Sequence, residues 1–489
     1  MNKIYIVGLG PGSMDSLTLG AVNRINSDKP HFLRTLKHPS VQYFNDNNIM
    51  FTSFDDIYDT KDSFDEVYNT IVLELIEAVK KHGEINYYVP GNPMVAEKTV
   101  QLLIESFNEE EIEIVSGISF IEPILEVMNK DPIEGLKVLD GIDIKASDVD
   151  INSHLIITQV YNSSVMSDAK LVLMEIYPDE YKVSLIHNAG ISGAEMVENL
   201  FLYEIDHSKN IGSLTSLFIP KVEKEKYPIY DYNDITNIMK QLRSEGGCPW
   251  DREQDHLSIR AAILEEAYEL VEALNGEDID HIVEELGDLL LQVVFQAQIA
   301  LDEGEFNPIL VTTSLANKLI TRHPHVFFQK NVDNSAEVVY NWDEIKYQSR
   351  NISLLSEKLR NIPRLPALMR SYKVQEKAAQ IGFDWEDIKG SSDKIIEEHN
   401  EVLEAYNLNG KGDFELEGEI GDLLFAVVNL SRFLEINPEV ALERTTGKFI
   451  KRLETMEYKA KEMGIILKEL NLEQLDNLWD LAKEDELSK

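Results

Sequence analysis

The sequence predicts a two-part protein, with an α/β N-terminal half and an all-α C-terminal half. Short apolar runs that end in glycine-rich loops recur over residues 1–220, as strands followed by tight turns do. Residues 233–489 instead show long amphipathic periods and few strand signals. A charged, proline-containing stretch, residues 221–232, lies between these two regions and is predicted to be a linker.

Composition restricts the class of protein. The chain has 489 residues, of which 43% are hydrophobic, and this content excludes a disordered chain. Its formal net charge of −41 disfavours binding to nucleic-acid polymers and anionic membranes, because both require basic surfaces. No apolar run reaches the ~18 residues of a membrane span, and the single cysteine, Cys248, cannot form an internal disulfide. We therefore expect a cytoplasmic protein, in which any nucleotide site needs metal ions and a few placed cations.

The N-terminal half is predicted to consist of strands joined by helices and turns. Its first apolar run ends at a loop that contains Gly8, Gly10 and Gly12. Residues 66–82 have the period of a helix, and a second turn occupies residues 90–93. The predicted strands are residues 4–7, 87–89, 112–115, 155–157 and 171–174, and residues 218–220 close the region.

A pattern of carboxylates occurs twice in the C-terminal half. In each copy, four glutamates precede a glutamate and an aspartate that are three residues apart. At about 100° per residue, the first, third and fourth glutamates share one stripe of a helix, and the later pair shares a face of the next helix. If these faces meet, they form an oxygen-only cage that is too negative to stand empty and that suits Mg²⁺ or Mn²⁺. The residues are Glu265, Glu266, Glu269, Glu272, Glu285 and Asp288, and then Glu397, Glu398, Glu401, Glu404, Glu419 and Asp422.

Other features recur in the same order, which indicates an internal duplication. Each copy has a tryptophan beside an acid, Trp250 in the first and Trp385 in the second, and later a pair of basic residues four positions apart. We predict a first repeat over residues 233–353 and a second over residues 354–489. The basic pairs are Lys318 with Arg322, and Lys448 with Arg452.

A solvated acidic face is the alternative explanation of a single glutamate block. Apolar residues at 289–291 and 293–295 directly follow Asp288 and predict that this helix is largely buried. Buried carboxylates are costly unless they are paired or bind a metal. The doubled array therefore favours a metal site over a solvated face.

With these motifs, residues 246–489 resemble the MazG nucleoside triphosphate pyrophosphohydrolases, an all-α family. The resemblance also rests on Cys-Pro-Trp-Asp at 248–251 and Arg-His-Pro-His-Val-Phe at 322–327. It implies hydrolysis of a nucleoside triphosphate to the monophosphate and pyrophosphate, with Mg²⁺ or Mn²⁺, on a helical bundle that forms a homodimer or larger homo-oligomer. The implied metal ligands are Glu265, Glu266, Glu269, Glu285 and Asp288 in the first repeat, and Glu397, Glu398, Glu401, Glu419 and Asp422 in the second.

Phosphate chemistry suggests further roles. Metal ions neutralise phosphate oxygens and lower the pKa of a bound water. The candidates for accepting that water's proton are Glu266 and Glu398. The candidates for binding phosphates are Lys318, Arg322, Lys448 and Arg452, with a solvated helix face as the alternative. The candidates for stacking on a base are Trp250, Trp385 and Trp479, with a core or dimer contact as the more common role.

Residues 1–220 resemble the tetrapyrrole (corrin/porphyrin) methylases, which bind S-adenosylmethionine between two α/β domains. The resemblance rests on the loops at 8–12, 90–93 and 116–119. It implies two α/β subdomains and a cofactor site that includes Gly8, Gly10, Gly12, Gly91 and Asn92. The chain departs from the family at Asn92 and Ser13, where aspartate is frequent. These departures leave the fold expectation intact and count against methyl transfer.

The leading hypothesis is a Mg²⁺-dependent nucleotide pyrophosphohydrolase, for house-cleaning or control of the nucleotide pool, with an appended methylase-like domain. The first alternative is an S-adenosylmethionine-dependent tetrapyrrole-type methyltransferase whose helical half only dimerises it. The second is a non-enzymatic regulator that senses ligands with both halves. The doubled cage argues against both alternatives, because dimerisation alone does not need it. The base preference and the identity of the catalytic repeat stay open.

Overall fold

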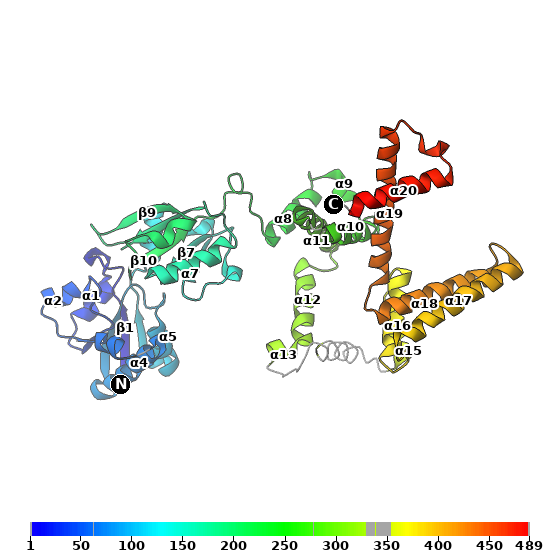
Figure 1. The fold of residues 1–489 in the computed structure, drawn as a ribbon. Coiled ribbons are helices and arrows are strands. Elements are labelled where there is room, and N and C mark those ends of the chain that lie inside the picture. Colours follow the sequence, from blue (N-terminus) through cyan, green and yellow to red (C-terminus); the bar gives the residue numbers. More distant parts are fainter. Residues whose placement is uncertain (1, 62, 277, 329–337, 339–353, 488–489) are drawn as a thin grey trace. The chain divides into compact units, whose positions relative to one another are not determined.

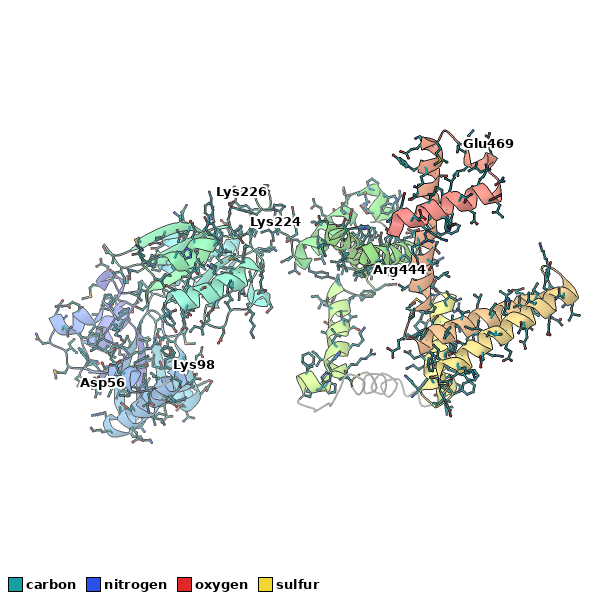
Figure 2. The ribbon with its side chains drawn as sticks, viewed as in Figure 1. Asp56, Lys98, Lys224, Lys226, Arg444 and Glu469 are labelled. Atoms are coloured by element: carbon teal, nitrogen blue, oxygen red, sulfur yellow. The ribbon has the colours of Figure 1, made fainter. Side chains whose placement is uncertain are left out.

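The computed structural model describes residues 2–61, 63–276, 278–328, 338 and 354–487. Its contacts divide the chain into two units, one that ends at Asn233 and one that begins at Asp234. The first unit is α/β and the second is helical, so the predicted fold class is confirmed (Figure 1). The predicted linker, which includes Lys224 and Lys226 (Figure 2), precedes this division. The finer domain limits stay predictions, and residues 329–337 and 339–353 of the first repeat lie outside the described part.

The first sheet is parallel, and helices cover both of its faces. Along β1, Ile4 and Ile6 belong to one apolar cluster, while Tyr5 and Val7 belong to another on the opposite face. A strand buried on both faces reads as a continuous apolar run, which is why β1 was predictable. The strand order is β3-β2-β4-β1-β5. The strands are β1 (Lys3–Gly8), β2 (His31–Leu33), β3 (Thr52–Ser53), β4 (Glu84–Val89) and β5 (Ile112–Val115).

The longest helix beside this sheet is α4, and local sequence sets both of its ends. The side chain of Ser63 caps it by accepting a hydrogen bond from the backbone N–H of Glu66. Gly83, at a φ of 79°, terminates it in a conformation that favours glycine. The helices of this part are α1 (Leu19–Ile25), α2 (Val41–Asp46), α3 (Asp55–Thr60), α4 (Phe64–His82), α5 (Lys98–Ser106) and α6 (Ile121–Met128).

The second sheet is mixed, with strand order β6-β7-β10-β8-β9. Its first two strands are parallel to each other, and the remaining neighbours are antiparallel. This sheet and helix α7 (Ser163–Met174) build a second apolar core. The strands are β6 (Leu136–Asp140), β7 (His154–Thr158), β8 (Lys182–His187), β9 (Met196–Phe201) and β10 (Thr215–Ile219).

The prediction of a strand at residues 171–174 is wrong, because these residues form the last turn of α7. Asn162 caps this helix by accepting a hydrogen bond from the backbone N–H of Val165. Its buried residues, Met166, Ala169 and Leu173, follow a spacing of three and four. The helical spacing of the apolar residues over the whole segment therefore predicts the structure better than the short apolar run at its end.

The second unit is built from helices, and two antiparallel pairs dominate its contacts. The pair α10–α11 belongs to the first predicted repeat and the pair α17–α18 to the second. In both pairs the second helix begins at an aspartate cap, Asp278 or Asp413. The helices of this unit are α8 (Tyr232–Arg243), α9 (Pro249–Glu253), α10 (Ala262–Gly276), α11 (Ile279–Asp302), α12 (Pro308–Arg322), α13 (Pro324–Phe327), α15 (Leu355–Arg360), α16 (Ala367–Ala379), α17 (Ile388–Asn409), α18 (Phe414–Phe433), α19 (Pro438–Glu462) and α20 (Leu472–Leu487).

The expectation that the helix carrying Glu285 and Asp288 is largely buried needs correction. One face of α11 is buried, but Leu290 and Val293 on another face are 41% and 45% exposed. An apolar run marks residues that avoid water, but it does not say whether the same chain covers them. Among the described residues, none of the helices combines the length and the apolarity that a membrane crossing requires.

Candidate metal centres

Three carboxylates meet between the helices of the first pair. Glu266 and Glu269 are three residues apart on α10 and therefore project from the same side of that helix. Glu285 comes from the second turn of α11. One oxygen from each lies within 4.8 Å of the others. The structure thus brings together three of the five residues predicted as metal ligands in this repeat.

The electrostatics of this first cluster favour a cation. Burial raises the pKa of Glu266, and the negative charges of Asp288, Glu269 and Glu285 raise it further. Glu285 is only 8% exposed, and its Oε2 has no hydrogen-bond partner in the described residues. Its Oε1 lies 3.1 Å from Nε2 of His281. A buried, unpartnered carboxylate oxygen beside like charges needs a positive ligand to offset its desolvation.

The second pair of helices also brings three carboxylates together, but one comes from its first helix and two from its second. Glu398 of α17 and both Glu419 and Asp422 of α18 place one oxygen each within 4.8 Å of the others. Burial, followed by the charges of Glu398 and Glu419, raises the pKa of Glu401. In this cluster Lys394 supplies a cation, because its Nζ lies 2.6 Å from Glu398.

Lys394 and Gln292 mark how the two clusters differ. Lys394 also reaches Glu397 at 2.9 Å, and hydrogen bonds with the two glutamates raise the pKa of its ammonium. In the first cluster the partner is a neutral amide, since Gln292 Nε2 donates to Glu266 Oε1 at 3.3 Å. Sequence analysis missed both residues. The i, i+4 spacing of Lys394 and Glu398 was the available signal for the first.

The remaining predicted ligands lie outside the two three-oxygen clusters. Glu265 is exposed, and Glu397 forms an ion pair with Lys394. The negative charge of Asp288 raises the pKa of Glu266. Glu401 likewise neighbours Glu398. Their roles as metal ligands stay predictions.

The predicted phosphate-binding residues stand on other helices. Lys318 and Arg322 lie on α12, which packs on α11, and Lys448 and Arg452 lie on α19. The guanidinium of Arg452 lies 5.5 Å from the ring centre of Trp479. Their role in binding phosphates stays a prediction.

The three tryptophans predicted to stack on a base differ in their surroundings. Trp250 is exposed and meets Phe295 edge to face at 6.4 Å. Trp385 lies against Gly390, where an added Cβ would approach its ring to 2.6 Å. Trp479 packs beside Phe449 at 4.9 Å, in the cluster formed with α20. Base stacking by any of them stays a prediction.

The glycine loops of the N-terminal unit pack tightly on one another. A Cβ on Gly8 would lie 2.5 Å from the carbonyl oxygen of Gly91 and 2.6 Å from the amide nitrogen of Gly117. Gly10 and Gly91 exchange backbone hydrogen bonds. Asn92 braces the same loops, because its Nδ2 donates to the Gly117 carbonyl at 2.8 Å and its Oδ1 accepts from the N–H of Met94 at 2.9 Å. The side chain of Asn92 thus serves loop packing.

A cavity of about 900 Å³ opens beside these loops, within the N-terminal unit. Of the five predicted cofactor residues, Gly91 lines it, while Gly8, Gly10, Gly12 and Asn92 belong to the loops alongside. Lys98 at the start of α5 (Figure 2) also lines it. So do Arg34 and Glu97, which form an ion pair of 2.5 Å, and burial raises the pKa of Glu97 to about 7. Sequence analysis missed this pair, because its two members are far apart in the chain.

Comparison with known proteins defines the class of each part. The model of the MazG nucleotide pyrophosphohydrolase domain matches residues 254–327 and 389–456, which contain the two helix pairs. The model of the tetrapyrrole (corrin/porphyrin) methylases matches residues 3–206. Both resemblances predicted from the sequence are confirmed.

The matches to three relatives cover nearly the whole length of each relative. YabN of Bacillus subtilis is 41% identical over 99% of both chains. The nucleoside triphosphate pyrophosphohydrolase/pyrophosphatase MazG of Thermotoga maritima is 45% identical over 52% of this chain and 95% of its own length. A nucleoside triphosphate pyrophosphohydrolase of Escherichia coli is 41% identical over 52% of this chain and 97% of its own. The chain therefore belongs to the MazG nucleotide pyrophosphohydrolase family, in a form that carries a tetrapyrrole methylase domain on its N-terminal side.

Proposed function

We propose that the helical unit hydrolyses nucleoside triphosphates to nucleoside monophosphates and pyrophosphate with Mg²⁺, or Mn²⁺, as its cofactor. The observation that carries the proposal is that two equivalent helix pairs each bring three carboxylates together. Glu266 and Glu285 of the first cluster correspond in the repeat to Glu398 and Glu419 of the second. The names of the relatives from Thermotoga maritima and Escherichia coli support the substrate class. The chain is accordingly proposed to be a hydrolase that acts on an acid anhydride.

The donor atoms of the clusters fit a hard divalent cation. Both clusters offer only carboxylate oxygens, which Mg²⁺ and Mn²⁺ prefer. The unpartnered Oε2 of Glu285 and the crowding of like charges around Glu266 are the features that a cation would relieve. When bound, the metal supplies neutralisation of phosphate charge and a water of lowered pKa.

Three roles remain for the side chains of the protein: metal binding, proton acceptance and phosphate binding. Glu269 and Glu285 in the first cluster, and Glu419 and Asp422 in the second, would hold the ion and fix its position. Glu266 or Glu398 accepts the proton of the attacking water on a carboxylate oxygen. The water oxygen forms a bond to the α-phosphorus, the bond from that phosphorus to the bridging oxygen breaks, and pyrophosphate leaves. Lys318, Arg322, Lys448 and Arg452 are proposed to bind phosphate oxygens.

A homodimer or larger homo-oligomer is part of the proposal, because each helix pair leaves an apolar seam exposed. On α11 the seam comprises Ile279, Val283, Leu286, Leu290 and Val293, all exposed and spaced alternately by four and three residues. This spacing is that of helices which pack along a seam with another helix.

The second repeat carries the same seam on α18. Ile420, Leu424 and Val427 are exposed there and take the same relative positions as Leu286, Leu290 and Val293. Two seams exposed in one chain offer complementary apolar surfaces to a second copy. Since a soluble monomer rarely leaves contiguous apolar surface uncovered, we propose that a second copy covers them.

For the N-terminal unit we propose that the cavity beside the glycine loops is the place for S-adenosylmethionine, and that it binds this cofactor weakly or not at all. The support is the methylase domain match together with the place of Gly91 in the lining of the cavity. Methyl transfer is not part of the proposed function. Calorimetric titration of the full-length chain with S-adenosylmethionine is expected to show weak binding or none, and tight binding with methylation of a precorrin-like acceptor would contradict this expectation.

The test of the proposed hydrolysis is product analysis with the full-length chain. Each of the common nucleoside triphosphates is incubated with the protein in Mg²⁺, in Mn²⁺ or in EDTA. We expect equal amounts of nucleoside monophosphate and pyrophosphate with either metal, and no turnover in EDTA. Release of inorganic phosphate as the sole anion would contradict the proposal. The relative rates also give the base preference.

A further inference from the structure

A third group of metal-ligating side chains lies at the end of α11. His256, which precedes α10, and Glu303 and Glu305, which follow α11, place one ligand atom each within 4.8 Å of the others. The distance between His256 Nε2 and Glu305 Oε2 is 3.4 Å. These residues are separate from both carboxylate clusters described above, and they combine nitrogen with oxygen.

Gln296 of α11 fixes the ring of His256. The amide Nε2 of Gln296 faces the backbone carbonyl oxygen of His256 at 3.4 Å, and that oxygen accepts hydrogen bonds only. The amide Oε1 must therefore face the ring, where it lies 2.5 Å from Nδ1 of His256. Because Oε1 accepts, Nδ1 carries a proton. In the neutral imidazole this leaves the lone pair on Nε2, which is the state that binds metal.

The ring of His256 is one-third exposed, and both glutamates are exposed. Nε2 of His256 is buried from solvent, and the described residues give it no hydrogen-bond partner. A ring nitrogen that lies beside carboxylates, while the other ring nitrogen is held by an outer hydrogen bond, has the setting of a metal-binding histidine.

The backbone around the two glutamates is anchored. Gly304, at a φ of 73°, turns the chain between them, and the N–H of Glu305 donates to the carbonyl of Ala300 at 2.9 Å. The neighbouring Asp302 pairs with Arg243 at 2.6 Å. The same guanidinium donates to the carbonyl of Gln254 at 3.1 Å, so the loop that carries His256 is tied to the same end of α11.

We propose that His256, Glu303 and Glu305 form a binding site for a borderline divalent ion, with Zn²⁺ as the preferred occupant. One imidazole nitrogen and two carboxylate oxygens provide three protein ligands, and water completes the coordination. A site with a nitrogen ligand selects Zn²⁺ over Mg²⁺, whereas the oxygen-only clusters suit Mg²⁺.

The position of this site gives it a structural consequence. Gln292, which holds Glu266 of the first cluster, and Gln296, which holds His256, are one helical turn apart on α11. An ion on His256 fastens the loop before α10 to the end of α11. It therefore fixes the start of the helix that presents Glu266 and Glu269.

The test is zinc binding by the full-length chain in excess Mg²⁺, measured by competition with a chromophoric zinc chelator. The excess Mg²⁺ occupies the oxygen-only clusters. We expect one tightly bound zinc ion per chain in the wild type, and loss of this ion in His256→Gln. Gln296→Leu, which removes only the orienting group, is expected to weaken binding by about 10- to 100-fold.

His207→Gln is the matched control, because His207 is an exposed histidine that lies 3.8 Å from the carboxylate of Asp206. It is expected to bind zinc as the wild type does. Glu303→Gln replaces an exposed side chain and provides a second variant should His256→Gln fail to fold, as judged by circular dichroism. If zinc binding is equal in the wild type, His256→Gln and Glu303→Gln, or if the wild type binds no zinc, His256 only forms an ion pair with Glu305 and the proposal is overturned.

Discussion

Replacing Glu269 with glutamine is expected to stabilise the metal-free helical unit while weakening its response to Mg²⁺. The substitution keeps the shape of the side chain and removes one charge from the first cluster. The two neighbouring carboxylates, Glu266 and Glu285, have oxygens within 4.8 Å. At that separation each like-charged pair repels by about 0.9 kcal/mol in water, so that two pairs cost about 2 kcal/mol before screening. A Debye length of about 8 Å at physiological ionic strength reduces this to about 1 kcal/mol.

The assay is thermal unfolding of the full-length chain, first in EDTA and then in saturating Mg²⁺. A gain of about 1 kcal/mol raises the Tm of a unit of this size by about 2–4 °C. In EDTA, the Tm of Glu269→Gln should therefore be higher than that of the wild type. In Mg²⁺ the order should reverse, because binding to the native state stabilises the wild type more. Glu272→Gln, one turn further along α10 and outside the cluster, should match the wild type in both conditions. A lower Tm of Glu269→Gln in EDTA would refute the charge argument.

Three further predictions concern the seam, the second cluster and the effect of pH. Leu290→Glu combined with Leu424→Glu should convert the oligomer to monomers in analytical ultracentrifugation, whereas an unchanged mass would exclude the seam as the contact. Lys394→Ala should tighten Mn²⁺ binding, measured by electron paramagnetic resonance, by up to about 5-fold, because the ammonium no longer competes for Glu398; weaker binding would contradict this. Because the pKa of Glu266 is raised in the folded protein, the folded state binds a proton at this residue more readily than the unfolded chain does. The stability that protonated Glu266 contributes is therefore present at acid pH and is lost as the pH rises through the folded pKa. In EDTA at neutral pH, the Tm of Glu266→Gln should therefore be higher than that of the wild type, and this difference in Tm should shrink on acidification. A difference in Tm that does not depend on pH would contradict the prediction.

The helical period made the two clusters predictable, but not their full membership. Glutamates at spacings of three and four must share a side of a helix, so the sequence indicated that each helix pair presents carboxylates to its partner. Which of Glu265 and Glu266 faces α11 depends on the rotation of α10 about its axis, and tertiary packing sets this rotation. The structure places Glu266 in the cluster and leaves Glu265 exposed.

Burial and distant contacts were less accessible to sequence reasoning. The apolar run after Asp288 predicted a buried helix, yet Leu290 and Val293 are exposed, because an apolar residue does not reveal whether its own chain or a second copy covers it. His256 and Glu305 are 49 positions apart in the numbering and meet only in the folded chain. The strand predicted at residues 171–174 failed because a short apolar run cannot be told from the buried end of a helix.

The central claim is that the carboxylate clusters are the active sites. Its most direct test is pyrophosphate release by the full-length variant that carries both Glu285→Gln and Glu419→Gln, since these residues occupy equivalent places in the two clusters. The control variant carries Glu272→Gln and Glu404→Gln, which belong to the same repeated pattern but lie outside the clusters. We expect the control to match the wild type and the cluster variant to lose activity by ~100-fold or more, because the bound metal positions charge at the reacting phosphate. Unchanged turnover in the cluster variant would contradict the claim.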